Sequence, residues 1–301
     1  MVMTSTASLP KERVARPKRP RHLSEAMRCE TAFRLIVSEC LEDVATNHDA
    51  TCGGDGTALH QTRVALTRLR AAVAFYGKMV ADIEWTRLKS ELKWLSSHLG
   101  ATRDLDVAIQ DTKGTPDEGA FIAARTEAFA ALKDALESER YRQWFDAMWD
   151  WVGSGPWTAR QDLRAARRRS VPVAEFHARK LARWHRKLNE KSRGIQGMGK
   201  TKRHDLRLAS KRLRYAIEFS EGGLPAEDYA HWRDIAKQLR KGQQILGELN
   251  DADVQRALIT SLNKPAKPVE ERAAKHAKLH ARKKKGRMLR RAATVYHKIG
   301  G

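Results

Sequence analysis

A helical segment that occurs twice constrains the fold of this chain more than any other feature. The stretch HQTRVALTRLRAAVAFYG at 60–77 has a counterpart, HDLRLASKRLRYAIEFSE, at 204–221. Aligned on their first residues, the two segments place histidine on histidine, three arginines on arginines and phenylalanine on phenylalanine. Both carry apolar residues at the three-to-four residue spacing of an amphipathic helix. The chain therefore contains one helix design in two copies.

The segment that follows each copy is repeated as well. EWTRLKSELKWLSSHLGATRDLDV occupies 84–107, and HWRDIAKQLRKGQQILGELNDADV occupies 231–254. Both contain a Leu-Gly pair followed by an Asp-x-Asp-Val sequence at the same spacing. Two blocks repeated in the same order indicate an internal duplication. We therefore divide the domain into two similar helical halves, about 23–152 and 153–298.

The rest of the chain predicts an all-α fold. Nearly every segment after residue 22 has helical spacing, and no run of alternating β-branched residues occurs. Residues 1–22 form a basic arm with three prolines, which we expect to be disordered. The segment near the C-terminus can form a long closing helix. Glycine and proline end the helices at 46–57, 113–119, 153–158, 194–199, 222–225 and 263–268. Helices of this length joined by short loops are typical of antiparallel bundles.

The charge of the chain indicates a polyanionic partner. Its formal net charge is +22, yet 41% of its residues are hydrophobic, so the excess of lysine and arginine is not a sign of general disorder. Nucleic acid, an anionic membrane surface and a polymer of phosphate fit that charge.

Other classes of protein are not indicated. The three cysteines, Cys29, Cys40 and Cys52, suggest neither a disulfide framework nor a metal site. No apolar run approaches the roughly 20 residues of a membrane span, and no secretion signal is recognisable. We expect a cytoplasmic protein that binds neither metal nor membrane.

The duplicated helix has one cationic side and one apolar side. At 100° per residue, its histidine and the residues three, seven and ten positions later lie on one side. In the two copies this stripe consists of His60, Arg63, Thr67 and Arg70, and of His204, Arg207, Lys211 and Arg214. No acidic residue belongs to either stripe. Stacked cations repel one another unless an anion lies between them, and the arginine fork suits phosphate oxygens. A solvated basic face is the alternative for a single helix, but the repetition favours an anion site.

These motifs resemble those of the CHAD family, the conserved histidine α-helical domain. The resemblance rests on HQTRVALTRLRA and HDLRLASKRLRYAIEF with the trailing LGATRDLDV and LGELNDADV. It implies two four-helix bundle halves related by pseudo-two-fold symmetry, with basic faces turned onto a central groove or pore. It also implies binding of inorganic polyphosphate and association with polyphosphate granules, without catalysis and without a cofactor.

The resemblance implies that the two stripes contact the polyphosphate. The residues carried over by position are His60, Arg63, Arg70, His204, Arg207, Lys211 and Arg214. A second set of cations that we consider for the same groove is Arg68, Lys93, Arg179, Arg183, Arg212 and Arg240. The family usually has a cation where this chain has Thr67, so we expect the first half to bind more weakly.

Two other functions remain open from the residues. The first is nucleic-acid binding or an architectural role, using the same basic surface. The second is an enzyme acting on phosphate esters with His60 or His204 as the reactive group. No phosphate-cradling glycine loop is apparent, and both histidines lie in stripes of cations rather than beside a carboxylate that would orient them, which disfavours the second.

The acidic motif has two interpretations. On a helix, Asp104 and Asp106 point 200° apart, as do Asp251 and Asp253, so neither pair closes on one metal ion unless the backbone is extended. The preceding Gly100 and Gly247 suggest a bend. We therefore favour helix capping or an internal ion pair over a metal site.

The tryptophans are expected to form core. Trp144, Trp149, Trp151 and Trp157 cluster where the two halves join, and we expect them to pack there.

Overall fold

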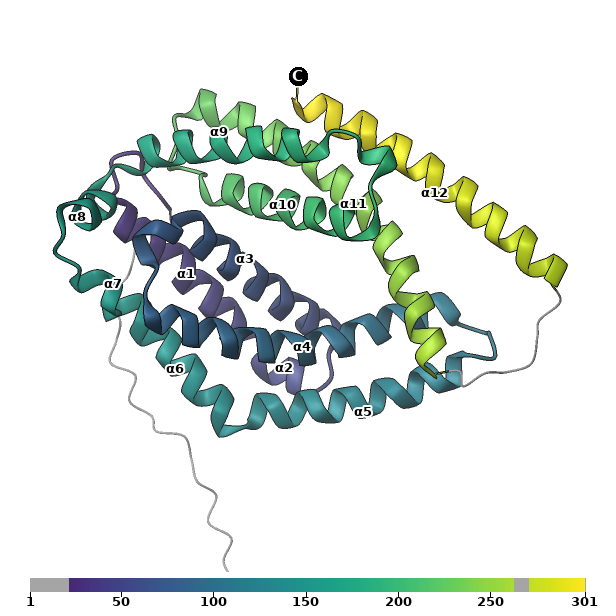
Figure 1. Cartoon of the computed structure of the whole chain (residues 1–301). Coiled ribbons are helices and arrows are strands. Elements are labelled where there is room, and N and C mark those ends of the chain that lie inside the picture. Colours follow the sequence, from purple (N-terminus) through teal and green to yellow (C-terminus); the bar gives the residue numbers. More distant parts are fainter. Residues whose placement is uncertain (1–21, 263–270, 301) are drawn as a thin grey trace, which may run out of the picture.

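The computed structural model describes residues 22–262 and 271–300, and the side chains of these residues outside 250–283. The described part is all-α, as predicted, and contains no strand (Figure 1). The helices of the first half are α1 (Cys29–Thr46), α2 (His48–Cys52), α3 (Gly56–Val80), α4 (Ile83–Thr112), α5 (Glu118–Glu137) and α6 (Glu139–Ser154). Those of the second half are α7 (Pro156–Ala159), α8 (Leu163–Ser170), α9 (Val173–Ser192), α10 (Lys200–Phe219), α11 (Ala226–Leu262) and α12 (Glu271–Gly300), with a 3-10 turn at Ile195–Gly197.

Five of the six predicted breaks separate helices, and the sixth, at 263–268, lies outside the described residues. So does nearly all of the basic arm that we expect to be disordered. The side chain of Asp55 caps α3 by accepting from the backbone N–H groups of residues 57 and 58. Asp82 caps α4 in the same way, and it also accepts from Trp151 Nε1 at 3.0 Å and from the Trp157 backbone at 3.1 Å. One carboxylate therefore fixes both the start of α4 and the segment that joins the halves.

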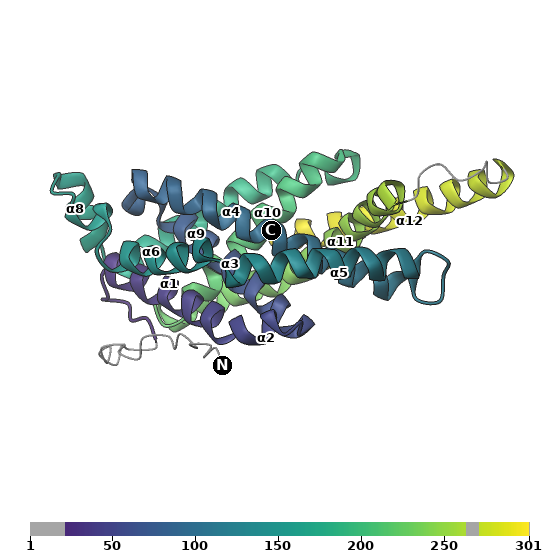
Figure 2. The ribbon, with the colours of Figure 1, turned by 90° about the horizontal axis from the view of Figure 1, so that it is seen from below.

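The two duplicated helices pack against each other. Helix α3 contacts α10 and is flanked by α1 and α4, whereas α10 is flanked by α9 and α11 (Figure 1). Helices α11 and α12 contact each other and extend towards the end of the molecule opposite α8 (Figure 2). The long closing helix predicted near the C-terminus is therefore present as α12.

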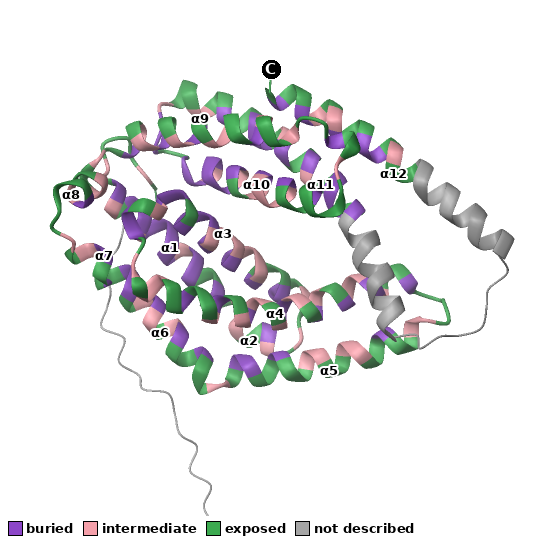
Figure 3. Cartoon of the chain, in the orientation of Figure 1, coloured by how far each residue is buried: buried purple, intermediate pink, exposed green. Residues whose placement is uncertain are grey.

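One apolar core runs through both halves. It extends from α1 to α12, and Figure 3 shows its buried residues concentrated on α1, α3 and α10. The tryptophans predicted to pack are in the core: Trp144, Trp151 and Trp157 are buried, and Trp149 packs partly buried against the same core. The Phe33 ring of α1 contacts Trp151 and Trp157 edge-on, at 5.7 and 5.3 Å between centroids.

The predicted bend at the Leu-Gly pairs is wrong. Helix α4 continues through Gly100 without a break, and α11 continues through Gly247. Asp104 therefore lies in the interior of a helix and caps nothing. A glycine inside a helix costs about 1 kcal/mol relative to alanine.

Candidate anion-binding site

The cationic stripes of the two duplicated helices meet. Helices α3 and α10 run in the same direction, because successive positions along α3 approach successive positions along α10. His60 is close enough to Lys211 to respond to its charge. Eight residues further along both helices, the Arg68 guanidinium lies 5.8 Å from the Phe219 ring centroid. The first half of one stripe therefore faces the middle of the other.

His60 reports the resulting concentration of positive charge. Partial burial lowers the pKa of His60, and the charges of Arg103, Arg63 and Lys211 lower it further. Arg207 in turn acts on Arg63 across the two helices and helps to lower the pKa of that guanidinium, for which burial is the larger cause. We call the five residues His60, Arg63, Arg103, Arg207 and Lys211 the central cluster.

Arg63 is anchored to the helix that follows it. Its Nη1 donates to the backbone carbonyls of Leu99 and Gly100, at 2.9 and 3.1 Å. A Cβ on Gly100 would stand 3.7 Å from the same nitrogen. In the second half, the position of a Cβ on Gly247 lies 4.0 Å from Nε of Arg207. Both distances are ordinary van der Waals contacts, so the arginine of each stripe lies beside the glycine of the Leu-Gly pair without requiring it.

The second arginine of each stripe is anchored as well. Arg70 donates to the Leu92 carbonyl at 2.9 Å and to Ser96 Oγ at 2.5 Å. Arg214 donates to Gln243 Oε1 at 3.0 Å. Ser96 and Gln243 are aligned positions of the two copies. The internal duplication therefore preserves an arginine contact as well as the helix pattern.

The stripes are less isolated from acids than the sequence suggests. Glu218, one turn beyond the second stripe, accepts from Arg214 at 2.7 Å and from Arg240 at 2.9 Å. Asp104 of α4 lies 3.9 Å from Arg63. Glu218 therefore offsets part of the charge of Arg214 and Arg240, and Asp104 offsets part of the charge of Arg63.

The remaining candidates differ in their surroundings. Arg68 turns towards α1 and pairs with Asp43 at 3.1 Å, and Arg179 pairs with Glu175 at 3.2 Å. Four others are exposed and make no ion pair with a described carboxylate: Lys93, Arg183, His204 and Arg212.

Sequence analysis missed Arg103, which acts on His60 from α4. Ser96, Gly100 and Arg103 share one face of α4 at i, i+4 and i+7 spacing, and this pattern could have indicated that Arg103 faces α3.

The aspartates of the first acidic motif form internal ion pairs, one of the two interpretations that we favoured. Asp106 accepts from Arg125 Nε at 3.1 Å and lies 3.7 Å from Arg103. No group of three or more His, Cys, Asp or Glu side chains among the described residues could hold a metal ion. The side chains of Asp251 and Asp253 lie outside the described residues.

A Ser-His contact elsewhere in the fold is not a catalytic site. His177 of α9 is fully buried, with Nδ1 2.8 Å from Ser220 Oγ and Nε2 2.7 Å from Tyr76 OH. Burial lowers the pKa of His177 to about 3. Ser220 is itself fully buried and donates to the Ala216 carbonyl. A nucleophile must reach a substrate, so this network serves packing between the halves.

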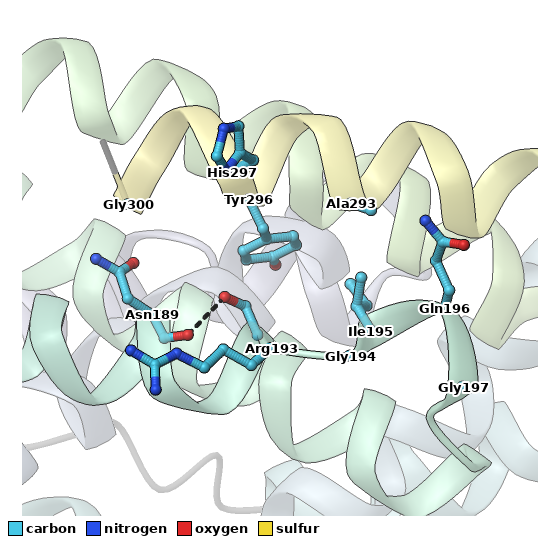
Figure 4. A pocket seen from close by; sticks show the side chains of 11 residues that line it. Asn189, Arg193, Gly194, Ile195, Gln196, Gly197, Ala293, Tyr296, His297 and Gly300 are labelled. Carbon is cyan, nitrogen blue, oxygen red and sulfur yellow. Dashed lines mark hydrogen bonds between the residues drawn. The ribbon is translucent and has the colours of Figure 1, made fainter.

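A cavity of about 630 Å³ lies beside the end of α12, bordered by Asn189, Ile195, Tyr296 and Gly300 (Figure 4). Its lining includes one arginine, Arg193. It shares no residue with the central cluster, so it does not contribute to an anion site there.

None of the described helices is both long enough and apolar enough to cross a membrane.

Comparison with known proteins places the chain in a family. The family model for the CHAD domain matches residues 35–260, which include both copies of the duplicated helix. No curated protein matches the chain. Among solved structures, the CHAD domain from the plant Ricinus communis superposes with a TM-score of 0.71 at 26% sequence identity, over 94% of this chain and 97% of that chain. The chain therefore belongs to the CHAD domain family.

Proposed function

We propose that this protein binds inorganic polyphosphate at the central cluster, without converting it, and that it associates with polyphosphate granules through this binding. The observation that carries the proposal is the convergence of His60, Arg63, Arg103, Arg207 and Lys211 from three helices. Cations gathered at one place repel one another, and a polyanion that contacts several of them at once relieves this repulsion. A flexible anion with a charge on every unit can contact all five together.

The anchoring of the arginines supports binding of phosphate oxygens. Arg63 and Arg70 are held by backbone carbonyls, so their guanidinium groups lose little conformational freedom when an anion binds. Arg207 has a buried Nε with no hydrogen-bond partner among the described residues. Guanidinium groups held in place in this way suit the repeated oxygens of a phosphate chain.

The surroundings of His60 support a role in binding rather than catalysis. A histidine that acts as a general base or nucleophile is usually oriented by a carboxylate. The groups that act on His60 are three cations, and they favour its neutral form. An approaching polyanion would reverse that preference and stabilise the protonated ring.

The test compares two triple variants that remove the same residue types. The first is His60→Gln, Arg207→Gln and Lys211→Gln in the central cluster. The second is His297→Gln, Arg291→Gln and Lys298→Gln on α12. All three of these residues are exposed. We expect the first variant to lose affinity for long-chain polyphosphate by at least about tenfold, since each charge-assisted contact contributes about 1.5–3 kcal/mol. The second should change it by less than about threefold. Circular dichroism checks that both remain folded.

Equal losses in the two variants would show that binding is a general effect of net charge and would remove the proposed site. Competition with DNA tests the nucleic-acid alternative. At equal phosphate concentration, long-chain polyphosphate should displace duplex DNA from the wild-type protein, and failure to do so would favour the nucleic-acid function.

A further inference from the structure

The cationic side of α3 continues beyond the duplicated stripe. Lys78 follows His60 by 18 residues (78 minus 60), which is five full turns at about 3.6 residues per turn. It therefore lies on the same side of α3 as His60, about 27 Å further along the axis at 1.5 Å per residue. The position aligned with Lys78 in the second copy is Gly222, so the extension belongs to one half only.

Helix α9 packs beside this end of α3. The Phe75 ring contacts the rings of Phe176 and Trp184 edge-on, at 5.5 and 5.3 Å between centroids. The hydroxyl of the neighbouring Tyr76 is hydrogen-bonded to Nε2 of the buried His177, at 2.7 Å. These contacts fix the exposed side of α9 next to Lys78.

Three cations of α9 gather near Lys78. The Nζ of Lys180 lies over the Phe176 and Trp184 rings, 5.9 and 5.6 Å from their centroids. Burial lowers the pKa of Lys180 to about 8, and the charges of Arg183, Lys78 and Lys187 contribute to this shift. We call Lys78, Lys180, Arg183 and Lys187 the α9 cluster.

The α9 cluster lacks compensation within the described part of the chain. None of its four side chains makes an ion pair with a described carboxylate. A further cation, Arg168 of α8, approaches the same place and donates to the backbone carbonyl of Lys78 at 3.5 Å. This differs from the far end of the second stripe, where Glu218 forms ion pairs with both Arg214 and Arg240. Uncompensated cations that repel one another favour binding of an anion.

We propose that the α9 cluster is a second subsite for the same polyphosphate chain, which runs from the central cluster along α3 to Lys78, Lys180, Arg183 and Lys187. This inference rests on the proposed function. It predicts that the protein favours chains long enough to span both clusters, because a chain held at one cluster meets the other at a high effective concentration. Short anions occupy one cluster at a time.

The test measures affinity against chain length. The variant is Lys78→Gln, Lys180→Gln, Arg183→Gln and Lys187→Gln. Its matched control is Lys284→Gln, Lys285→Gln, Arg291→Gln and Lys298→Gln, which removes the same residue types from exposed positions of α12. The probes are tripolyphosphate, too short to span the two clusters, and long-chain polyphosphate. We expect the α9 variant to lose about tenfold or more in affinity for the long chain relative to the control. Its affinity for tripolyphosphate should match that of the control within about threefold.

Protection of Lys180 gives a second readout. An amine with a lowered pKa reacts readily with acylating reagents near pH 8, and mass spectrometry reports modification at each lysine. Long-chain polyphosphate should slow acylation of Lys180 in the wild type and in the central-cluster variant at saturating ligand. The second subsite would be overturned if the wild type bound the long chain tightly, the α9 variant lost no affinity for it and Lys180 were not protected. That outcome would leave the proposed function intact. Absence of polyphosphate binding by the wild type would overturn both.

Discussion

The buried histidine between the halves should make folding stability depend on pH. His177 is fully buried, and its pKa is lowered from an ordinary 6.5 to about 3 by burial. Below pH 6.5 the unfolded chain binds a proton at this position that the native chain does not bind until about pH 3. The native state is therefore progressively disfavoured as the pH falls below 6.5. Between pH 7 and pH 5 the expected loss from this one group is about 2 kcal/mol.

Urea unfolding followed by circular dichroism at pH 7 and pH 5 measures this loss. Other groups titrate in the same interval, so the informative quantity is the difference between the wild type and His177→Gln. The glutamine keeps a polar side chain next to Tyr76 and Ser220 but does not titrate. The wild type should lose about 2 kcal/mol more than this variant between the two pH values. As a control, Tyr76→Phe removes one hydrogen bond to the ring and keeps it buried, so its loss should follow the wild type. Equal losses in wild type and His177→Gln would show that the imidazole is accessible to protons in the native state, and the reasoning would be refuted.

Three further predictions concern the site and its support. Gly100→Ala should raise the free energy of unfolding by up to about 1 kcal/mol in the same urea assay, because alanine removes the cost of a glycine inside a helix. The added Cβ would lie at an ordinary 3.7 Å from Arg63 Nη1. A clear fall in the free energy of unfolding would mean that Arg63 needs more room. Gly155→Ala should instead destabilise the fold by about 1–3 kcal/mol, because its Cβ would lie 2.5 Å from the Trp151 carbonyl oxygen, and an unchanged melting temperature would contradict this. Binding of polyphosphate near pH 6.5 should take up protons and weaken as the pH rises, since the lowered pKa of His60 rises when its cationic neighbours are neutralised. Calorimetry in two buffers of different ionisation enthalpy measures the uptake, which His60→Gln should reduce.

Local structure followed closely from the sequence. Helical periodicity and glycine or proline at the breaks predicted the all-α fold and the positions of the described loops, because these signals act within a few residues. The duplication showed which helices correspond, and the tryptophan positions indicated a buried junction. The bend predicted at Gly100 is wrong, because α4 continues through this residue without a break. A glycine weakens a helix without necessarily bending it, so its presence alone does not predict where a helix bends.

The sequence by itself determined that two similar helices each carry a row of cations, since that depends only on the angle between successive residues of a helix. The tertiary structure alone decided how those cations are used. Packing of α3 against α10 brings Lys211 towards His60, while Arg68, off the centre of its stripe, turns to Asp43 of α1. Packing of α4 beside α3 brings Arg103 to His60, and packing of α9 brings Lys180 towards Lys78. The surroundings of a side chain depend on helices that are distant in sequence, so periodicity fixes which side of a helix a charge lies on, and packing between helices fixes which other charges it meets.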